Sequence, residues 1–205
     1  MKKHLNINKY LYLMNLYLLR HETRGILPTF FTSLTDEGID NAKTNIIKRL
    51  EKYNIKKIYC SPFLRTLQTI RYYCEKHSMQ VNCENSLYEY LLDPIFEDEK
   101  KYYDQNDISD PNLINIISKK YTTFLPISCI QYPEDDELIV KRVKPFIQSI
   151  FDKKENNILL VSHMSTCNAI IKMFNPSRDI NDWISLGGLI KIVIKNDQES
   201  ELHML

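Results

Sequence analysis

Apolar runs and segments with helical periodicity alternate along most of this chain. The first run, residues 14–19, is short and nearly continuous, which is typical of a strand buried on both faces of a sheet. The other strands that the pattern predicts lie at residues 57–60, 80–83, 157–162 and 189–194.

Helices are predicted between these strands. One begins at Thr35 or Asp36, either of which can cap the free N–H groups, and it keeps apolar residues at helical spacing as far as Leu50. Ser61 is a good N-cap and Pro62 fits a first turn, so a second helix is predicted to begin there. Further helices are predicted at residues 112–121, 134–151 and 165–174. Because strands alternate with helices, the sequence predicts an α/β fold around a mostly parallel sheet with right-handed crossovers.

Length and composition favour a single domain. The chain has 205 residues, enough for one domain with a sizeable core. Residues 90–133, which are rich in Asp, Asn, Tyr and Pro, are the least regular part, and we interpret them as a cap-like insertion. Residues 1–12 are interpreted as a short extension rather than a signal peptide, because Asn15 interrupts the apolar run and no small-residue cleavage site follows. Residues 1–205 are therefore assigned to one domain.

Charge, glycine and cysteine content exclude several classes of function. The net charge of +1, with acids and bases interspersed, predicts no binding to nucleic acid, and no segment is long and apolar enough to span a membrane. The 4 glycines form no glycine-rich nucleotide loop. The 5 cysteines are scattered, without a C-x-x-C pair, and are predicted to be free buried thiols in a reducing compartment, so a cytoplasmic location is expected.

Two histidines and three arginines fall where α/β sheets bind ligands, beyond the carboxyl ends of the strands. His21 and His163 each follow a predicted strand, and Arg20 and Arg24 flank the first of them. Arg65 lies in the first turn of a predicted helix, where backbone N–H groups also favour anions. Guanidinium groups bind phosphate oxygens in pairs and stay charged at all relevant pH. This edge of the sheet is therefore predicted to form a phosphate pocket.

Each of these residues, taken alone, has an ordinary structural interpretation. An isolated Arg-His pair is usually surface charge, Arg65 a solvated helix residue, and His163 a core histidine bonded to backbone. The acidic clusters at residues 97–99 and 134–137 are interpreted as solvated surface, because no spacing of His, Asp and Glu resembles a metal-ligand set. We expect neither a metal nor a cofactor.

Four segments carry an ordered set of motifs. They are Leu18-Leu19-Arg20-His21-Glu22-Thr23, Leu34-Thr35-Asp36-Glu37-Gly38, Ser61-Pro62-Phe63-Leu64-Arg65-Thr66-Leu67-Gln68-Thr69 and Leu160-Val161-Ser162-His163. In this order they resemble the histidine phosphatase superfamily, which includes cofactor-dependent phosphoglycerate mutases, and the third segment is a close match to its Ser-Pro-x-x-Arg-x-x-Gln-Thr pattern. The resemblance spans most of residues 14–194. It implies a phosphoglycerate-mutase-like three-layer sandwich, with a mostly parallel central sheet flanked by helices.

The resemblance also implies a role for each matching residue. His21 is the implied nucleophile and forms a phosphohistidine, and Glu89, where the family often places its acid, is the implied proton donor to the leaving group. The implied phosphate ligands are Arg20, Arg24, Arg65 and His163. Asp93 is the alternative acid if Glu89 is structural. Burial is expected to let Glu89 hold its proton near neutrality.

The activity that the resemblance implies is hydrolysis of a phosphomonoester, in the manner of a histidine acid phosphatase, with a phosphorylated small molecule or phosphopeptide as substrate. A phosphoglycerate mutase or sugar bisphosphatase is one alternative, and a non-catalytic interaction module that keeps the fold is another. Glu22 departs from the family, which usually has glycine after the catalytic histidine. It either strains a backbone position with positive φ or adds a negative charge near the pocket.

Overall fold

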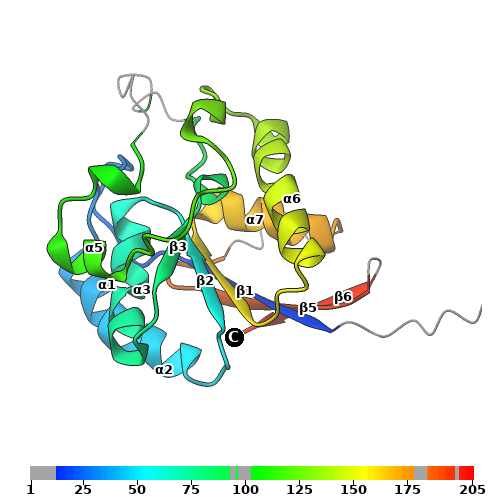
Figure 1. Ribbon diagram of the computed structural model, residues 1–205, viewed down its shortest axis with the longest axis horizontal. Helices are drawn as coiled ribbons and strands as arrows, with labels where there is room; N and C mark the ends of the chain where they lie inside the picture. The colour runs from blue at the N-terminus through cyan, green and yellow to red at the C-terminus, as the bar shows by residue number, and fades with distance from the viewer. Residues whose placement is uncertain (1–12, 93–95, 97–102, 178–183, 197–198) are drawn as a thin grey trace, which may run out of the picture.

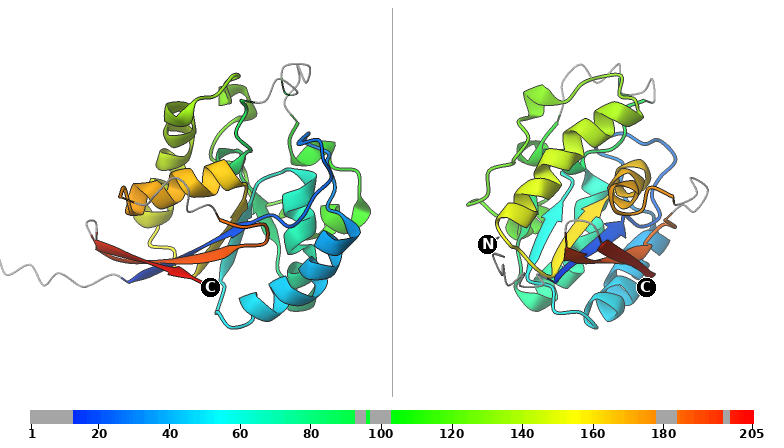
Figure 2. Two further views of the ribbon diagram at one scale, coloured as in Figure 1. Left: turned by 180° about the vertical axis from the view of Figure 1, so that it is seen from behind. Right: turned by 90° about the vertical axis from the view of Figure 1, so that its right-hand side faces the viewer.

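One mixed sheet of six strands, with helices on both faces, organises the molecule (Figures 1 and 2). The computed structural model describes residues 13–92, 96, 103–177, 184–196 and 199–205. The strands, in chain order, are β1 Met14–Arg20, β2 Lys57–Cys60, β3 Val81–Cys83, β4 Ile158–Ser162, β5 Leu189–Asn196 and β6 Glu199–Met204. They lie in the order β3-β2-β4-β1-β5-β6; the first four are parallel, whereas β5 and β6 are antiparallel to their neighbours.

The helices form two groups that cover opposite faces of the sheet (Figures 1 and 2). The longer ones are α3 Leu64–His77, α6 Asp136–Asp152 and α7 Met164–Phe174. The shorter segments are α1 Asp36–Asn41, a π-helical turn Ala42–Ile46, α2 Ile47–Leu50, α5 Pro111–Ile116 and the 3₁₀ turns Asn85–Leu87, Gln105–Asp107 and Ile127–Cys129. The helices α1, α2, α3 and α5 lie on one face, and α6 and α7 lie on the other.

Strand β1 shows why its run of apolar residues is continuous. Tyr17 and Leu19 are buried in the core beneath α3, whereas Leu16 and Leu18 are buried in the core beneath α6 and α7. Side chains of a strand alternate between the two faces of the sheet, so a strand covered on both faces needs apolar residues at every position. The predicted three-layer sandwich with a mostly parallel central sheet is confirmed.

The predicted strands and helices are confirmed with three differences. The helix predicted at 112–121 ends at Ile116, because residue 117 forms a bridge with Val81 and Ser118 N–H donates to the Val81 carbonyl at 2.9 Å. Strand β6 was not predicted, and β5 is antiparallel. The third helix in the structure begins at Leu64, and its N-cap is Phe63 rather than Ser61.

The predictions for the cysteines and for the outlying segments can also be compared with the structure. Cys60, Cys74, Cys83 and Cys167 are free and buried as predicted, but Cys129 is exposed, because it lies in a 3₁₀ turn at the surface. The extension at 1–12, the acidic cluster at 97–99 and Asp93 lie outside the described residues. Within those residues no helix combines the length and the apolar character needed to cross a membrane.

Helix α1 is packed tightly against the segment that follows β1. Thr35 accepts a hydrogen bond from Gly38 N–H at 3.2 Å, as expected of an N-cap, and a Cβ atom added to Gly38 would lie 2.2 Å from the Thr23 carbonyl oxygen. A contact this short with backbone forces the helix away from the segment.

Gly38→Ala is therefore expected to lower the free energy of unfolding by roughly 1–3 kcal/mol, as overpacking typically does. Gly25→Ala is the control, because a Cβ there would meet its nearest atom, Thr32 Cγ2, at an ordinary 3.4 Å. Urea denaturation measures both values. Equal stability losses in the two variants would contradict the predicted clash.

Candidate active site

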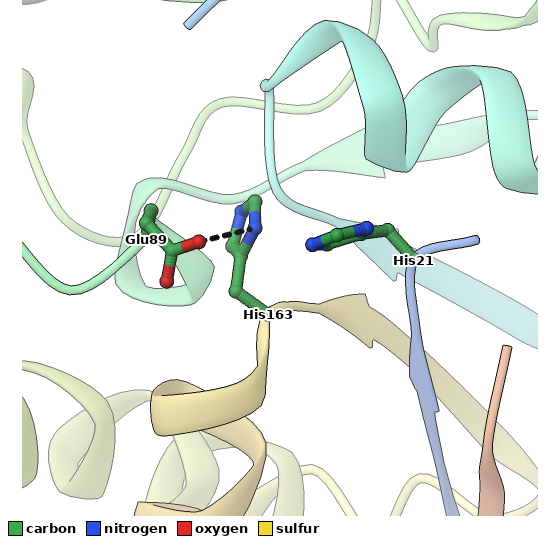
Figure 3. A group of neighbouring side chains, drawn as sticks. All are labelled: His21, Glu89 and His163. Atoms are coloured by element: carbon green, nitrogen blue, oxygen red, sulfur yellow. Dashed lines mark ion pairs between the residues drawn. The ribbon is translucent and has the colours of Figure 1, made fainter. Parts of the chain in front are cut away.

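The pairing of two central strands brings the two histidines together. Arg20 at the end of β1 is in register with Ser162 at the end of β4, so His21 and His163 both follow neighbouring strand ends. The backbone N–H of His21 donates to the Ser162 carbonyl at 3.0 Å. The two rings lie 5.3 Å apart, and Figure 3 shows the His21 ring pointing toward His163, with Glu89 on the far side of His163.

His21 is held as a neutral imidazole with a free nitrogen. Its Nδ1 lies 2.7 Å from the backbone carbonyl oxygen of Glu22. Because a carbonyl only accepts hydrogen bonds, Nδ1 carries the proton and Nε2 keeps its lone pair. Burial, and then His163 and Arg65, lower the pKa of His21 well below its usual value. A neutral imidazole with a lone pair on Nε2 is the form of histidine that attacks phosphorus.

His163 is fully buried and is fixed by Ser61. The ring Nε2 lies 2.9 Å from the Ser61 hydroxyl oxygen, which explains why Ser61 does not cap the helix. Burial lowers the pKa of His163 to about 4, although the carboxylate of Glu89 acts in the opposite direction. If the Ser61 hydroxyl donates to Nε2, the single proton of the neutral ring is on Nδ1. That nitrogen lies 3.2 Å from Glu89 Oε2 and, among the described residues, has no well-directed hydrogen bond.

Two arginines, one wholly buried and one half-buried, supply positive charge. Arg65 is wholly buried; it donates through Nη2 to Glu89 Oε2 at 3.1 Å and through Nη1 to the Thr29 carbonyl at 2.7 Å. Arg20 donates through Nη1 to the Ile184 carbonyl at 2.8 Å, and burial lowers its pKa. Its Nε is buried and has no partner in the described part of the chain. A buried guanidinium N–H without an acceptor is costly, so Arg20 Nε favours a bound anion.

Glu89 is ionised in the unliganded site. Burial alone would raise the pKa of its carboxyl, but His163 and Arg65 outweigh burial, and the pKa lies well below its usual value. When His163 is neutral, Arg65 and the Tyr90 backbone N–H, which donates to Glu89 Oε1 at 2.9 Å, still favour the carboxylate anion. The expectation that burial keeps Glu89 protonated is therefore wrong for the site without substrate, because the folded chain places His163 and Arg65 beside the carboxyl.

Two further predicted features lie at the margin of this pocket. Arg24 donates through Nη1 to the carbonyls of Gly25 and Ile26, at 2.6 and 2.7 Å, and so binds its own loop. Glu22 does not have positive φ, so replacing glycine there stores no strain of that kind. Its carboxylate is buried, burial raises its pKa, and it contacts the turn at Gly187, where an added Cβ would lie 2.0 Å from Oε1.

His21, Glu89 and His163 are the described residues whose possible metal-ligating atoms cluster, all within 4.8 Å of one another. Arg65 already donates to the Glu89 oxygen that faces the histidines and adds a positive charge there. This arrangement favours an anion over a cation.

A buried ion pair that the sequence analysis missed holds the segment carrying Glu89. Arg142 donates through Nε to Glu134 Oε1 at 2.7 Å and through Nη1 to the carbonyls of Ser86 and Tyr88 at 3.0 and 3.1 Å. Glu134 also accepts from the Leu91 N–H at 3.1 Å. The prediction that Glu134 belongs to solvated surface is therefore wrong: it is 3 % exposed, because Arg142 compensates its charge in the interior. No local pattern in the sequence signals this pair.

The comparisons agree with this geometry. A profile of the histidine phosphatase superfamily (branch 1) matches residues 30–200, so the chain belongs to that superfamily, as the sequence motifs predicted. Membership supports a phosphatase-type activity. No curated protein sequence matches significantly. The match begins after Arg20 and His21, so the placement of these two residues rests on the geometry of β1 and β4.

Solved structures show the same fold at low identity. The α-ribazole phosphatase of Shigella flexneri is 22 % identical with a TM-score of 0.64, covering 94 % of this chain and 96 % of that one. The ecdysone phosphate phosphatase of Bombix mori, in complex with tungstate, is 14 % identical with a TM-score of 0.64, covering 93 % and 92 %. A phosphoglycerate mutase of Bacillus anthracis is 17 % identical with a TM-score of 0.63, covering 94 % and 92 %.

Breaking the buried pair from one side should destabilise the fold strongly. Arg142→Met leaves Glu134 as an unpaired buried charge, which is expected to cost about 3–5 kcal/mol, whereas Arg142→Met combined with Glu134→Leu should recover much of the loss. Lys141→Met, at an exposed neighbouring position, is the control. Denaturant unfolding measures the three values. A single variant as stable as the control would show that the pair is not essential to this segment.

Proposed function

We propose that this chain is a phosphomonoesterase that forms a phosphohistidine on His21. The observation that carries the proposal is a buried donor beside a neutral imidazole. Arg20 Nε is buried and lacks a hydrogen-bond partner in the described part of the chain, and the proton on His21 Nδ1 leaves a lone pair on Nε2. Leaving a buried donor unsatisfied costs about 1–3 kcal/mol, and an oxygen of a phosphoryl group would satisfy Arg20 Nε.

The proposed reaction has two steps. His21 Nε2 attacks the phosphorus atom, and the bond between phosphorus and the ester oxygen breaks as that oxygen takes a proton from Glu89. A water molecule then attacks the phosphohistidine, Glu89 takes a proton from the water, and inorganic phosphate leaves with His21 restored. Arg20, Arg65 and His163 stabilise the charge on the three oxygens that stay with the phosphorus.

The low pKa of Glu89 in the empty pocket fits this cycle. A bound phosphate monoester brings negative charge beside Glu89 and competes for the positive charge of Arg65. Both effects raise the pKa of the carboxyl, so Glu89 gains its proton when the substrate is present. The same carboxylate, ionised again after the leaving group has departed, is then the base that the second step needs.

A phosphorylated small molecule or phosphopeptide is the proposed substrate. The structural likeness to both phosphatases and a mutase shows the fold alone and does not choose between these activities. Dependence on a bisphosphoglycerate primer would distinguish a phosphoglycerate mutase or bisphosphatase from the proposed phosphomonoesterase. A non-catalytic module would turn over no aryl phosphate. The neutral His21 and the buried Arg20 Nε, which has no partner in the described part of the chain, support an enzyme over such a module.

Glu89→Gln should slow the two classes of substrate unequally. Alkyl phosphates, whose leaving groups need a proton, should lose roughly 10²–10⁴-fold in kcat, and activated aryl phosphates much less. Glu137→Gln, on the exposed first turn of α6, is the control. Equal losses on both substrates would mean that Glu89 only holds Arg65 and His163 in place.

His21→Ala should abolish both turnover and covalent labelling. Quenching the wild-type enzyme during turnover should trap phosphate on the protein that survives alkali and is lost in acid, as a phosphoramidate is. The variant should lack the label and lose several orders of magnitude in rate, because the covalent nucleophile is gone. His203→Ala, at a half-exposed position on β6, is the control. Turnover by His21→Ala above a few per cent of wild type would overturn the assignment.

A further inference from the structure

The loop between Arg24 and α1 is apolar at its surface. Residues 25–34 contain no charged side chain. Ile26 is 95 % exposed, Leu27 62 % and Phe31 43 %, and Leu92 is 55 % exposed on a separate segment. These four residues are here named the apolar rim. Single exposed apolar residues are ordinary on protein surfaces, but a group of them beside a polar pocket marks a binding surface.

The loop is fastened to the residues that form the phosphate pocket. Arg24 donates to the carbonyls of Gly25 and Ile26, and Arg65 donates to the carbonyl of Thr29. The next carbonyl, that of Phe30, accepts from Leu64 N–H at the start of α3 at 3.1 Å. The rim residues of this loop therefore have a defined position relative to Arg65.

Aromatic packing fixes the same loop from below. The ring of Phe30 lies 4.8 Å from that of Phe63, which lies 4.8 Å from the ring of His163. Phe31 packs edge-on against Tyr103, with the ring centroids 4.7 Å apart. A loop held by its backbone and by buried rings can present exposed apolar side chains without a large entropic cost on binding.

The loop that carries Ile26, Leu27 and Phe31 is joined to the residues where the leaving group is proposed to depart. Glu89 is the proposed proton donor to the leaving oxygen, and its carboxylate is bonded to Arg65, which is bonded to Thr29 in the loop. Leu92 follows Glu89 by three residues. The loop and Leu92 are thus both anchored to the Arg65–Glu89 pair, which the ester oxygen of a substrate is proposed to meet.

We infer that the apolar rim binds the organic part of the substrate, and that the substrate is a phosphomonoester of an apolar alcohol or phenol. The inference rests on the proposed function and names its substrate class. Sugar phosphates and phosphoglycerates carry hydroxyl or carboxylate groups, which need polar partners. Against Ile26, Leu27 and Phe31 those groups would lose water without gaining a hydrogen bond. An alkyl or aryl group instead gains from leaving water.

Binding of alkylphosphonates, which cannot be hydrolysed, tests the inference independently of turnover. Dissociation constants of the ethyl, butyl, hexyl and octyl compounds, measured by calorimetry, should fall with chain length by up to about fourfold per methylene. A phosphonate with a dihydroxypropyl chain, which is also resistant to hydrolysis, should bind no better than the ethyl compound. The double variant Ile26→Ser/Leu27→Ser should lose more than half of the gain per methylene. Met204→Ser, which removes an equally exposed apolar side chain from the edge strand β6, should keep the full gain.

The outcomes separate this inference from the proposed function. Chain-length-dependent binding that the double variant reduces, together with no turnover of any phosphate, would support the rim and contradict the phosphatase. Turnover of phosphates with affinities that do not change along the series would overturn the rim alone. A chain-length gain that the double variant leaves intact would also overturn it, and binding of none of the phosphonates would count against both.

Discussion

The parallel pairing of β1 with β4 is the contact on which the proposed site depends. Its register sets Arg20 opposite Ser162, and the residue that follows each strand is a histidine. The strands must be apolar at every position because helices cover both faces, so neither can shift by one residue without turning polar groups into a core. The same packing that stabilises the sheet therefore fixes the distance between His21 and His163.

Burial and neighbouring charges together set the pKa values of the three titratable side chains in the pocket. Burial and the nearby charge of Arg65 lower the pKa of both histidines, so both are neutral. Glu89 is ionised because its contacts with His163 and Arg65 together outweigh the burial that would raise its pKa. Among the described residues, the positive charges of Arg20 and Arg65 exceed the charge of the facing carboxylate of Glu89. A phosphate monoester restores the balance, and in doing so alters the pKa of the group that is proposed to protonate the leaving oxygen.

The buried ion pair of Arg142 and Glu134 holds the segment that carries Glu89. Arg142 and Glu134 are bonded to one another and to backbone groups of residues 86–91. Thr166 and Ser162 add hydrogen bonds to the Tyr88 and Leu87 carbonyls, at 2.6 and 2.7 Å. Glu89 thus belongs to a segment that is irregular in secondary structure but held by several side chains from α6, α7 and β4.

Local patterns in the sequence determined five of the six strands, most helix boundaries and the order of the motifs. Alternation of apolar runs with helical spacing is a property of neighbouring residues, and it predicted the mostly parallel α/β sheet. The phosphate-binding edge was predictable because parallel strands all end on one side. Arg20, His21, Arg65 and His163 converge there, as the positions after strands and in a first turn required.

Contacts between residues far apart in the sequence decided the features that local patterns did not predict. The local sequence predicts that Ser61 caps a helix, but its hydroxyl contacts His163, which lies 102 residues further along the chain. The local sequence predicts an exposed Glu134, but the residue is buried because Arg142 pairs with it. Glu89 loses the proton that burial alone would leave on it, because His163 and Arg65 lie beside its carboxyl, at 3.2 and 3.1 Å. Charge balance depends on distances between residues far apart in sequence, so the protonation state of this pocket could be read only from the folded chain.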